Sequence, residues 1–445
     1  MTERPSKPPI ITSLADSIDR LNFDSELNFL IISSLCPEAC IASAILCRGL
    51  IRAGHKFHLT FLEPIIRKET LSSLISSYSH LIPIVIGISI LNNASLSIGD
   101  KELVSLGHIF DTENGPLPGI ELLPIELGAA AYMLVRKYYP SNEDDLALAS
   151  ICSLLQSRKK PRHSESALEV VDIALDLSLI KETRGILLFG ANFMNINEIF
   201  MRSIHPYISG ITGNETASEK LLDSADISFS HRTKPLTSLN SDQIKDLSGV
   251  ILRQVPVEFV PHWSGLDYLI LGEKEKSYVY HISGIQALSS IAWANTQPGL
   301  LTGVLIGDRA TLLRELFDLY THTSLKVIKT MNELAIISPD SSSLKEDKNA
   351  SLVTLDESPS VLSLAGQIAI QNSFIVSENV LVFESESELI IVWPKNLLSF
   401  FTLFSEMLKS GLECKSLSYQ SISVRKTSSK TKERVLSTLS SFSGD

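Results

Sequence analysis

Four side chains in the N-terminal third of the sequence are the candidates for binding a catalytic metal: Glu38, Asp100, His108 and Asp111. Hard divalent cations such as manganese and magnesium take mainly oxygen ligands, and a pair of them activates water for in-line attack on a phosphate. Glu38 lies far from the other three, which fall within residues 100–111, and their spacing matches no known metal motif. A metal-dependent phosphoesterase built on them would therefore have an unfamiliar arrangement of ligands.

The cysteines show no paired spacing. An odd number without pairs argues against a disulfide framework and favours a reducing compartment. Structural zinc takes four ligands, usually as close Cys/His pairs, and no second pair lies near Cys36 and Cys40. We therefore expect buried thiols and no metal site. The five cysteines are Cys36, Cys40, Cys47, Cys152 and Cys414.

Two groups of basic residues are the candidates for contact with nucleic acid. A charge run is more often a solvated surface, but a single strand needs Lys and Arg for its phosphates and aromatic rings for its bases. Trp393 and Tyr419 are the candidate stacking residues. The basic residues are Arg158, Lys159, Lys160 and Arg162 in one group, and Arg425, Lys426, Lys430, Lys432 and Arg434 in the other.

The composition is that of a folded protein with more than one domain. The chain has 445 residues, of which 44% are hydrophobic and 20% charged, and this length exceeds one ordinary domain. The net charge of -11 argues against a protein coated with nucleic acid, but permits one local basic groove. The N-terminal residues lack the apolar core of a signal peptide, and the most apolar run, 81–91, is too short to cross a bilayer. We expect a soluble cytoplasmic protein without membrane contact.

Strands alternate with helices in the N-terminal part, which indicates a parallel sheet covered on both faces. Residues 28–35 and 81–91 have the continuous apolar runs of buried strands, and 55–64 alternates in polarity like a strand. Helices are expected over 41–53 and 66–80.

Three other features are interpreted as structural. The run at 303–311 lacks the Gly-Lys-Ser/Thr of a phosphate loop and predicts an apolar strand followed by a turn. His205 and His262 have no carboxylate at metal-ligand spacing, so packing or loop positions are expected. Asn295 lies in an otherwise apolar helix and is expected to satisfy local backbone groups.

Polar breaks divide the chain into segments. We expect a polar tail at 1–24, an α/β domain at 25–160, a linker helix at 161–184, a middle region at 185–337, a linker at 338–351 and a C-terminal domain at 352–445.

Several stretches resemble the archaeal RecJ-like proteins of the DHH phosphoesterase family. SLCPEACIASAIL at 34–46 follows a buried strand and opens a helix, where that family has a DADG-type motif. FMRSIHPYISGITGNETASEKLL at 200–222 and SGIQALSSIAWANTQPGLLTGVLIGDR at 283–309 are similar to segments of the archaeal RecJ-like proteins in particular. GIELLPIELGAAAYMLVRKYY at 119–139 is a weaker match. The resemblance implies a DHH-type parallel-sheet N-terminal domain, a middle α/β insert region and a small DHHA1-like α/β C-terminal domain.

The resemblance also aligns the family's metal-binding aspartates with residues of this chain, and only one of these residues is a carboxylate. The two aspartates of the first motif fall on Cys36 and Glu38, that of the second near Gly87, and that of the fourth near Leu154. The Asp-His-His triplet is absent, and SGLECKSLSY near 410–420 replaces the C-terminal Gly-Gly-His signature. A metal site fails first on the number of its ligands. The degenerate motifs therefore imply no cofactor and no nuclease activity.

Archaeal proteins of this kind associate with the GINS complex and the MCM helicase, and their eukaryotic relative is the nuclease-dead RecJ-derived subunit of the CMG helicase. The resemblance therefore implies a non-catalytic subunit of an archaeal replicative helicase assembly, located at the nucleoid. Single-stranded DNA is a further candidate ligand. By analogy, the family-specific insert at about 185–260 is the expected partner surface.

Two other hypotheses remain open. A divergent single-strand exonuclease or phosphoesterase would use manganese or magnesium on Glu38, Asp100, His108 and Asp111, and would lose its activity in Glu38→Ala. A stand-alone single-strand DNA-binding protein would bind in a salt-sensitive way, and charge reversal within 425–434 would weaken it.

Overall fold

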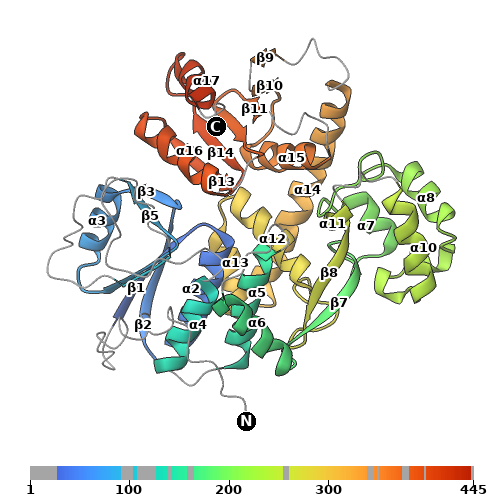
Figure 1. The fold of residues 1–445 in the computed structure, drawn as a ribbon, viewed down its shortest axis with the longest axis horizontal. Coiled ribbons are helices and arrows are strands. Elements are labelled where there is room, and N and C mark those ends of the chain that lie inside the picture. The colour runs from blue at the N-terminus through green and yellow to red at the C-terminus, as the bar shows by residue number, and fades with distance from the viewer. Residues whose placement is uncertain are drawn as a thin grey trace. The chain divides into compact units, whose positions relative to one another are not determined.

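The protein is represented by a computed structural model whose fold is drawn in Figure 1. The described residues are 28–91, 104–107, 127–138, 142–157, 165–253, 260–337, 345–347, 350–372, 380–394 and 397–441. The chain forms two compact units, each assembled from several stretches. Unit 1 comprises Met1–Lys181, Ile270–Gly272 and Pro298–Arg314, and unit 2 comprises Glu182–Leu269, Glu273–Gln297 and Glu315–Asp445.

Unit 1 is built on a parallel sheet with the strand order β2-β1-β4-β6. β1 is central, which explains why every residue from Phe29 to Ser34 is buried. The apolar run at 81–91 forms two strands and not one, because Gly87 turns the chain with a φ of 65°. The second strand, β5 (Ser89–Leu91), pairs with β3 (Ile65–Arg67). The sheet strands are β1 (Asn28–Ser34), β2 (Lys56–Leu62), β4 (Ile82–Ile86) and β6 (Val104–Leu106).

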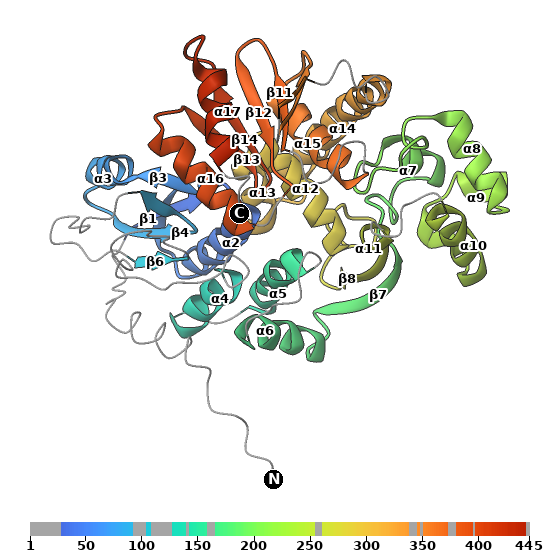
Figure 2. The same ribbon diagram turned by 45° about the horizontal axis from the view of Figure 1, so that its top comes forward.

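Helices cover both faces of this sheet, as the sequence predicts. α3 (Lys68–Ser77) packs Leu71 and Ile75 against Leu30 and Ile32 on one face. On the other face α2 begins directly after β1 and is buried along nearly its whole length. It packs against α4, α5 and α13 (Figure 2). The helices of this layer are α2 (Pro37–Arg52), α4 (Leu127–Tyr138), α5 (Glu143–Ser157), α6 (Glu165–Asp176) and α13 (Pro298–Ile306).

The strand predicted within 303–311 is wrong. Residues 303–306 are the last turn of α13, which packs against α2. The helix is apolar on every side, so its sequence has no helical periodicity and cannot be told from that of a buried strand.

The middle part of unit 2 is mainly helical and has a core of its own. The residues of this core include Ile199, Phe200, Leu221, Leu222 and Leu247. The two-stranded sheet of β7 (Ile180–Ile186) and β8 (Ser264–Ile270) flanks it. The predicted insert at 185–260 falls mostly in this part. Its helices are α7 (Ile196–Arg202), α8 (Glu215–Ser224), α9 (Phe229–Arg232), the 3-10 turn η2 (Leu236–Ser238), α10 (Ser241–Leu252) and α11 (Val260–Trp263).

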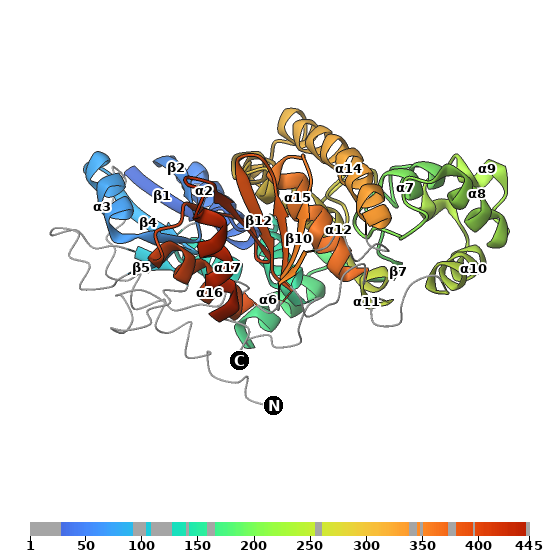
Figure 3. The same ribbon diagram turned by 90° about the horizontal axis from the view of Figure 1, so that it is seen from above.

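The C-terminal part of unit 2 contains a mixed six-stranded sheet with the order β13-β14-β12-β11-β10-β9, in which only β10 and β11 run parallel. Figure 3 shows α16 and α17 on one side of this sheet, and α15 and α12 on the other. The strands are β9 (Lys345–Asp347), β10 (Ala350–Thr354), β11 (Val380–Glu384), β12 (Glu388–Val392), β13 (Cys414–Ser418) and β14 (Ser421–Arg425). The helices are α12 (Ile282–Ala294), α14 (Thr311–Ile337), α15 (Pro359–Gln371), α16 (Leu397–Lys409) and α17 (Thr431–Ser441).

The predicted fold class is confirmed: an α/β protein with a parallel-sheet N-terminal region and a smaller sheet domain at the C-terminus. Two details differ from the expectation. The stretch 338–351, expected to be a linker, contains β9. The basic group at 425–434, expected at the end of the C-terminal domain as a basic tail, includes ordered elements: Arg425 ends β14, Lys432 and Arg434 lie on α17, and Lys426 and Lys430 fall between the two.

Candidate functional site

The first motif lies where β1 passes into α2. Cys36 is the residue that precedes the helix, and Glu38 stands in the first turn. Both side chains are buried, with exposed fractions of 3% for Cys36 and 2% for Glu38. Ser33 and Ser34 at the end of β1 are fully buried as well. The positions that a metal and its bound water would need to reach are therefore closed to solvent.

The second motif position, Gly87, is packed from three sides. A Cβ atom placed on it would lie 3.1 Å from Ala39 Cβ, 3.2 Å from Leu127 Cδ1 and 3.5 Å from Ser34 Cβ. Its φ of 65° is also a conformation that side chains other than glycine rarely adopt. An aspartate at this position would therefore be strained in its backbone, and its Cβ would press on the side chains of Ala39 and Leu127.

Cys152 on α5 is the residue that stands next to Glu38. Its thiol donates to the Glu38 backbone carbonyl at 3.8 Å, and it packs against Gly128 of α4, where any Cβ atom would overlap it. The fourth motif position was expected near Leu154, which is buried two residues further along the same helix. The sequence predicts Cys152 to be a buried thiol and gives no sign that it lies beside Glu38. Neither Cys152 nor Leu154 is a carboxylate, so this position of the fourth motif offers no metal-binding oxygen.

The thiols around this corner are poor metal ligands. Burial raises the pKa of both Cys40 and Cys152 well above that of an ordinary thiol, and the nearby charges of Glu38 and Cys36 raise it further. Burial also raises the pKa of Cys47 to about 12. Sulfur is a soft ligand, whereas the pair of hard dications that a DHH phosphoesterase requires takes oxygen ligands, so these thiols do not fit that pair.

The expectation of buried thiols is confirmed for Cys36, Cys40, Cys47 and Cys152, whereas Cys414 is partly exposed, and none of these five described cysteines forms a disulfide. Within the described ranges, no group of three or more His, Cys, Asp or Glu side chains is arranged to hold a metal ion. Asp100, His108 and Asp111 lie outside the described residues, and so do Arg158, Lys159, Lys160 and Arg162.

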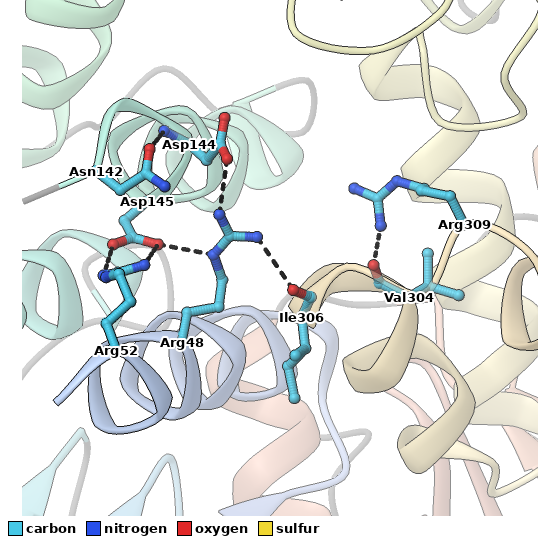
Figure 4. Close-up of polar contacts among 8 residues, drawn as sticks. All are labelled: Arg48, Arg52, Asn142, Asp144, Asp145, Val304, Ile306 and Arg309. Carbon is cyan, nitrogen blue, oxygen red and sulfur yellow. Dashed lines mark hydrogen bonds and ion pairs between the residues drawn. The ribbon is translucent and has the colours of Figure 1, made fainter. Parts of the chain in front are cut away.

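An ion-pair cluster with a buried carboxylate lies between α2, α5 and α13 (Figure 4). Asp145 is fully buried and accepts hydrogen bonds from Arg48 Nε, at 2.8 Å, and from Arg52. Arg48 also pairs with the exposed Asp144, at 2.8 Å, and donates to the carbonyl of Ile306 at the end of α13, at 3.2 Å. The buried carboxylate of α5 is thus neutralised by arginine. The sequence analysis does not predict this cluster. Its signals in the sequence are two arginines four residues apart on α2, which share one face of the helix, and an acidic pair at the start of the apolar helix α5.

The C-terminal basic residues are brought into one region but are not a free cationic surface. Lys426 and Lys432 both bind Glu384, at 2.9 and 2.7 Å. Arg425 lies 3.6 Å from Glu413, Arg434 donates to the carbonyl of Ser410, and Lys430 is exposed.

These two lysines make a testable contribution to stability. They hold the pKa of Glu384 below its usual value of 4.5, mainly through hydrogen bonds to its carboxylate. A lowered pKa in the folded state stabilises the protein above the ordinary glutamate pKa, and this stabilisation is lost as the pH falls through the folded-state value. We expect Glu384→Gln to lower the free energy of unfolding by about 1 kcal/mol at pH 7. Urea unfolding below pH 4 should show a smaller difference, and the exposed Glu386→Gln should show none at either pH. Equal losses at both pH values would contradict this account.

Of the two aromatic candidates, Trp393 is buried and Tyr419 is partly buried. Trp393 is only 2% exposed, so its predicted role is wrong. Tyr419 packs edge-on against Trp293, with ring centroids 4.5 Å apart, and also contacts Phe400 and Phe401. These rings form part of the packing of unit 2.

The structural interpretations of His205 and Asn295 are confirmed. His205 Nε2 lies 2.9 Å from the hydroxyl of Ser290, and its ring packs against Tyr320. Asn295 Nδ2 donates to the Ile291 carbonyl at 2.9 Å and to the Thr323 hydroxyl at 3.4 Å. The side chain of His262 lies outside the described residues.

The fold matches solved structures, while neither a protein-family model nor a curated protein sequence matches the chain. CDC45 from Entamoeba histolytica superposes with a TM-score of 0.62 at 12% identity, over 96% of this chain and 97% of that one. RecJ from Thermus thermophilus, in complex with Mn2+, superposes with a TM-score of 0.50 at 10% identity, over 98% of this chain and 54% of that one. The chain therefore has a RecJ-like and CDC45-like fold, and at these identities the likeness concerns the fold alone. Among the described helices, none is long and apolar enough to cross a bilayer.

Proposed function

We propose that this chain is a catalytically inactive RecJ-type protein that serves as a structural subunit of an archaeal replicative helicase assembly, with GINS and MCM as its partners. The observation that carries the first half of the proposal is the packing at Gly87. The position expected to supply a metal-binding aspartate is a glycine with a positive φ, and a Cβ atom there would lie within 3.2 Å of the side chains of Ala39 and Leu127.

The small number of possible metal ligands at the motif positions supports the proposal that the chain has no nuclease activity. Glu38 is the single carboxylate among the motif positions Cys36, Glu38, Gly87 and Leu154, and two dications need several carboxylate or imidazole ligands. Small and apolar side chains pack this corner without the mutual repulsion of clustered carboxylates. A protein that retains the fold without the metal-binding carboxylates is suited to a structural role in an assembly.

The helical middle part supports the role of a partner surface. It has its own hydrophobic core. Phe229, which opens α9, is 77% exposed, and no residue of α9 is buried. A large exposed aromatic side chain is the type of residue that contributes strongly to binding at protein interfaces.

The match to CDC45 supports the helicase assembly by fold analogy. Contact with single-stranded DNA is a secondary part of the proposal, and the exposed Arg425, Lys430 and Arg434 of the C-terminal basic group are the candidate cations.

Binding to GINS tests the partner half of this proposal. The purified chain is expected to co-elute with the GINS complex from the same source. Phe229→Ala should weaken this binding by about ten-fold or more, because it removes an exposed anchor and leaves the core intact. Leu325→Ala on α14 is the matched control, since Leu325 is 52% exposed but lies outside the insert. Absence of co-elution would reject the partnership, and equal effects of both variants would reject the insert as the binding surface.

A further inference from the structure

Strand β2 lies at one edge of the parallel sheet of unit 1 (Figure 1). It pairs with β1 in an unbroken register from Lys56 to Leu62. No strand in the described part of the chain pairs with its other side. An edge strand of this kind presents unpaired backbone groups to any strand that approaches.

The register determines which backbone groups point away from β1. The carbonyl of Leu62 accepts a hydrogen bond from the amide of Leu35 at 3.1 Å, so Leu62 faces β1. In a parallel ladder, alternate residues direct both their amide and their carbonyl toward the same neighbour. The amides and carbonyls of Phe57, Leu59 and Phe61 therefore point toward the open edge.

This edge lacks the features that usually prevent strands from pairing. Natural edges carry proline, bulges or charges along their length. The sequence of β2 is KFHLTFL, without proline, and its formal charge is confined to Lys56 at the first position. The side chains of Phe57, Leu59 and Phe61 are all partly exposed. Within the described residues this edge is therefore unpaired and mainly apolar, as an edge that accepts another strand would be.

The same three residues are complementary to themselves in an antiparallel arrangement. A two-fold axis through Leu59 places Leu59 opposite Leu59 of a second copy, and Phe57 opposite Phe61. All three have their backbone groups at the open edge, so these are hydrogen-bonded pairs, giving about six backbone hydrogen bonds. Aromatic pairs directly opposite one another stabilise antiparallel strands. The arrangement also brings the Lys56 end of each strand beside the Glu63 end of the other.

We propose that two copies of this chain associate through β2, which joins their parallel sheets into one continuous sheet across a two-fold axis. Closed two-fold dimers are the commonest homo-oligomers. A single strand pair is a small contact, below the roughly 1,200 Å² of a stable interface. The dimer is therefore reversible and concentration-dependent. This inference does not depend on the helicase role.

Sedimentation velocity of the full chain over a range of concentrations tests the proposal. The wild-type chain is expected to move from its monomer mass of 48.9 kDa toward twice that mass as the concentration rises. Leu59→Pro removes an amide at the open edge and leaves the hydrogen bonds to β1 in place, so it should abolish the dimer. Leu59→Val keeps the amide and a side chain suited to strands, and should dimerise like the wild type.

A charge exchange at the same position tests the two-fold axis without relying on proline. Leu59→Lys and Leu59→Glu each place like charges opposite one another, and each should weaken the dimer about ten-fold or more. An equal mixture of the two variants should regain association, because opposite charges then meet. A wild-type chain that stays monomeric throughout would overturn the proposal. So would a dimer that persists in Leu59→Pro, or a mixture of charge variants that associates no better than either alone.

Discussion

Replacing Asp145 with alanine is expected to lower the free energy of unfolding by about 3–5 kcal/mol. The side chain is fully buried and pairs with two arginines, whose exposed fractions are 14% for Arg48 and 27% for Arg52. Removing the carboxylate takes the ion-pair partner from Arg52 and leaves Arg48, which is 14% exposed, paired only with the exposed Asp144. Such an uncompensated buried charge costs much more than the net stabilisation of the intact pair.

Asp144→Ala is the matched control for this prediction. Asp144 is the neighbouring residue on α5 and also pairs with Arg48, but its side chain is 62% exposed. An exposed pair is worth about 1 kcal/mol or less. Denaturant unfolding of both variants would give the comparison. Similar small losses for the two would mean that the cluster does not hold α2, α5 and α13 together.

Introducing aspartate at Gly87 is expected to destabilise the protein by about 3 kcal/mol or more, and not to create a metal site. The new Cβ would lie 3.1 Å from Ala39 Cβ and 3.2 Å from Leu127 Cδ1, and its backbone would keep a positive φ. Two costs therefore add: the backbone conformation and the displacement of core side chains.

Gly54→Asp separates these two costs. Gly54 also has a positive φ, of 75°, but a Cβ there would meet nothing within 4 Å. This control should lose only about 1 kcal/mol, the cost of a left-handed conformation. Thermal unfolding with and without manganese gives both readouts. A Gly87→Asp chain that is as stable as the control and is stabilised further by manganese would contradict the claim that this position cannot accommodate a metal-binding aspartate.

The sequence predicts the N-terminal sheet well because its strands are marked by position and composition. β1 is a continuous apolar run in the centre of a parallel sheet, and such a strand needs no alternation, since both faces are covered. The split of 81–91 at Gly87 is less visible, because a glycine inside an apolar run signals a break only when its φ is known.

The features that the sequence does not predict depend on packing that local patterns do not record. α13 is apolar all round, which removes the periodicity that separates helix from strand. The pair of Arg48 and Asp145 joins residues 97 positions apart, and no local pattern records which distant charge a buried carboxylate will meet. Cys152 takes the place next to Glu38 through the packing of α4 on α5, which also lies outside the reach of local sequence patterns.

A manganese-dependent nuclease assay on single strands labelled at the 5′ or the 3′ end tests the central claim most directly. The wild-type chain and Glu38→Ala would be compared, because Glu38 is the last carboxylate among the motif positions. We expect no degradation by either protein. Degradation by the wild type that disappears in Glu38→Ala would contradict the account and identify a phosphoesterase with a rearranged metal site.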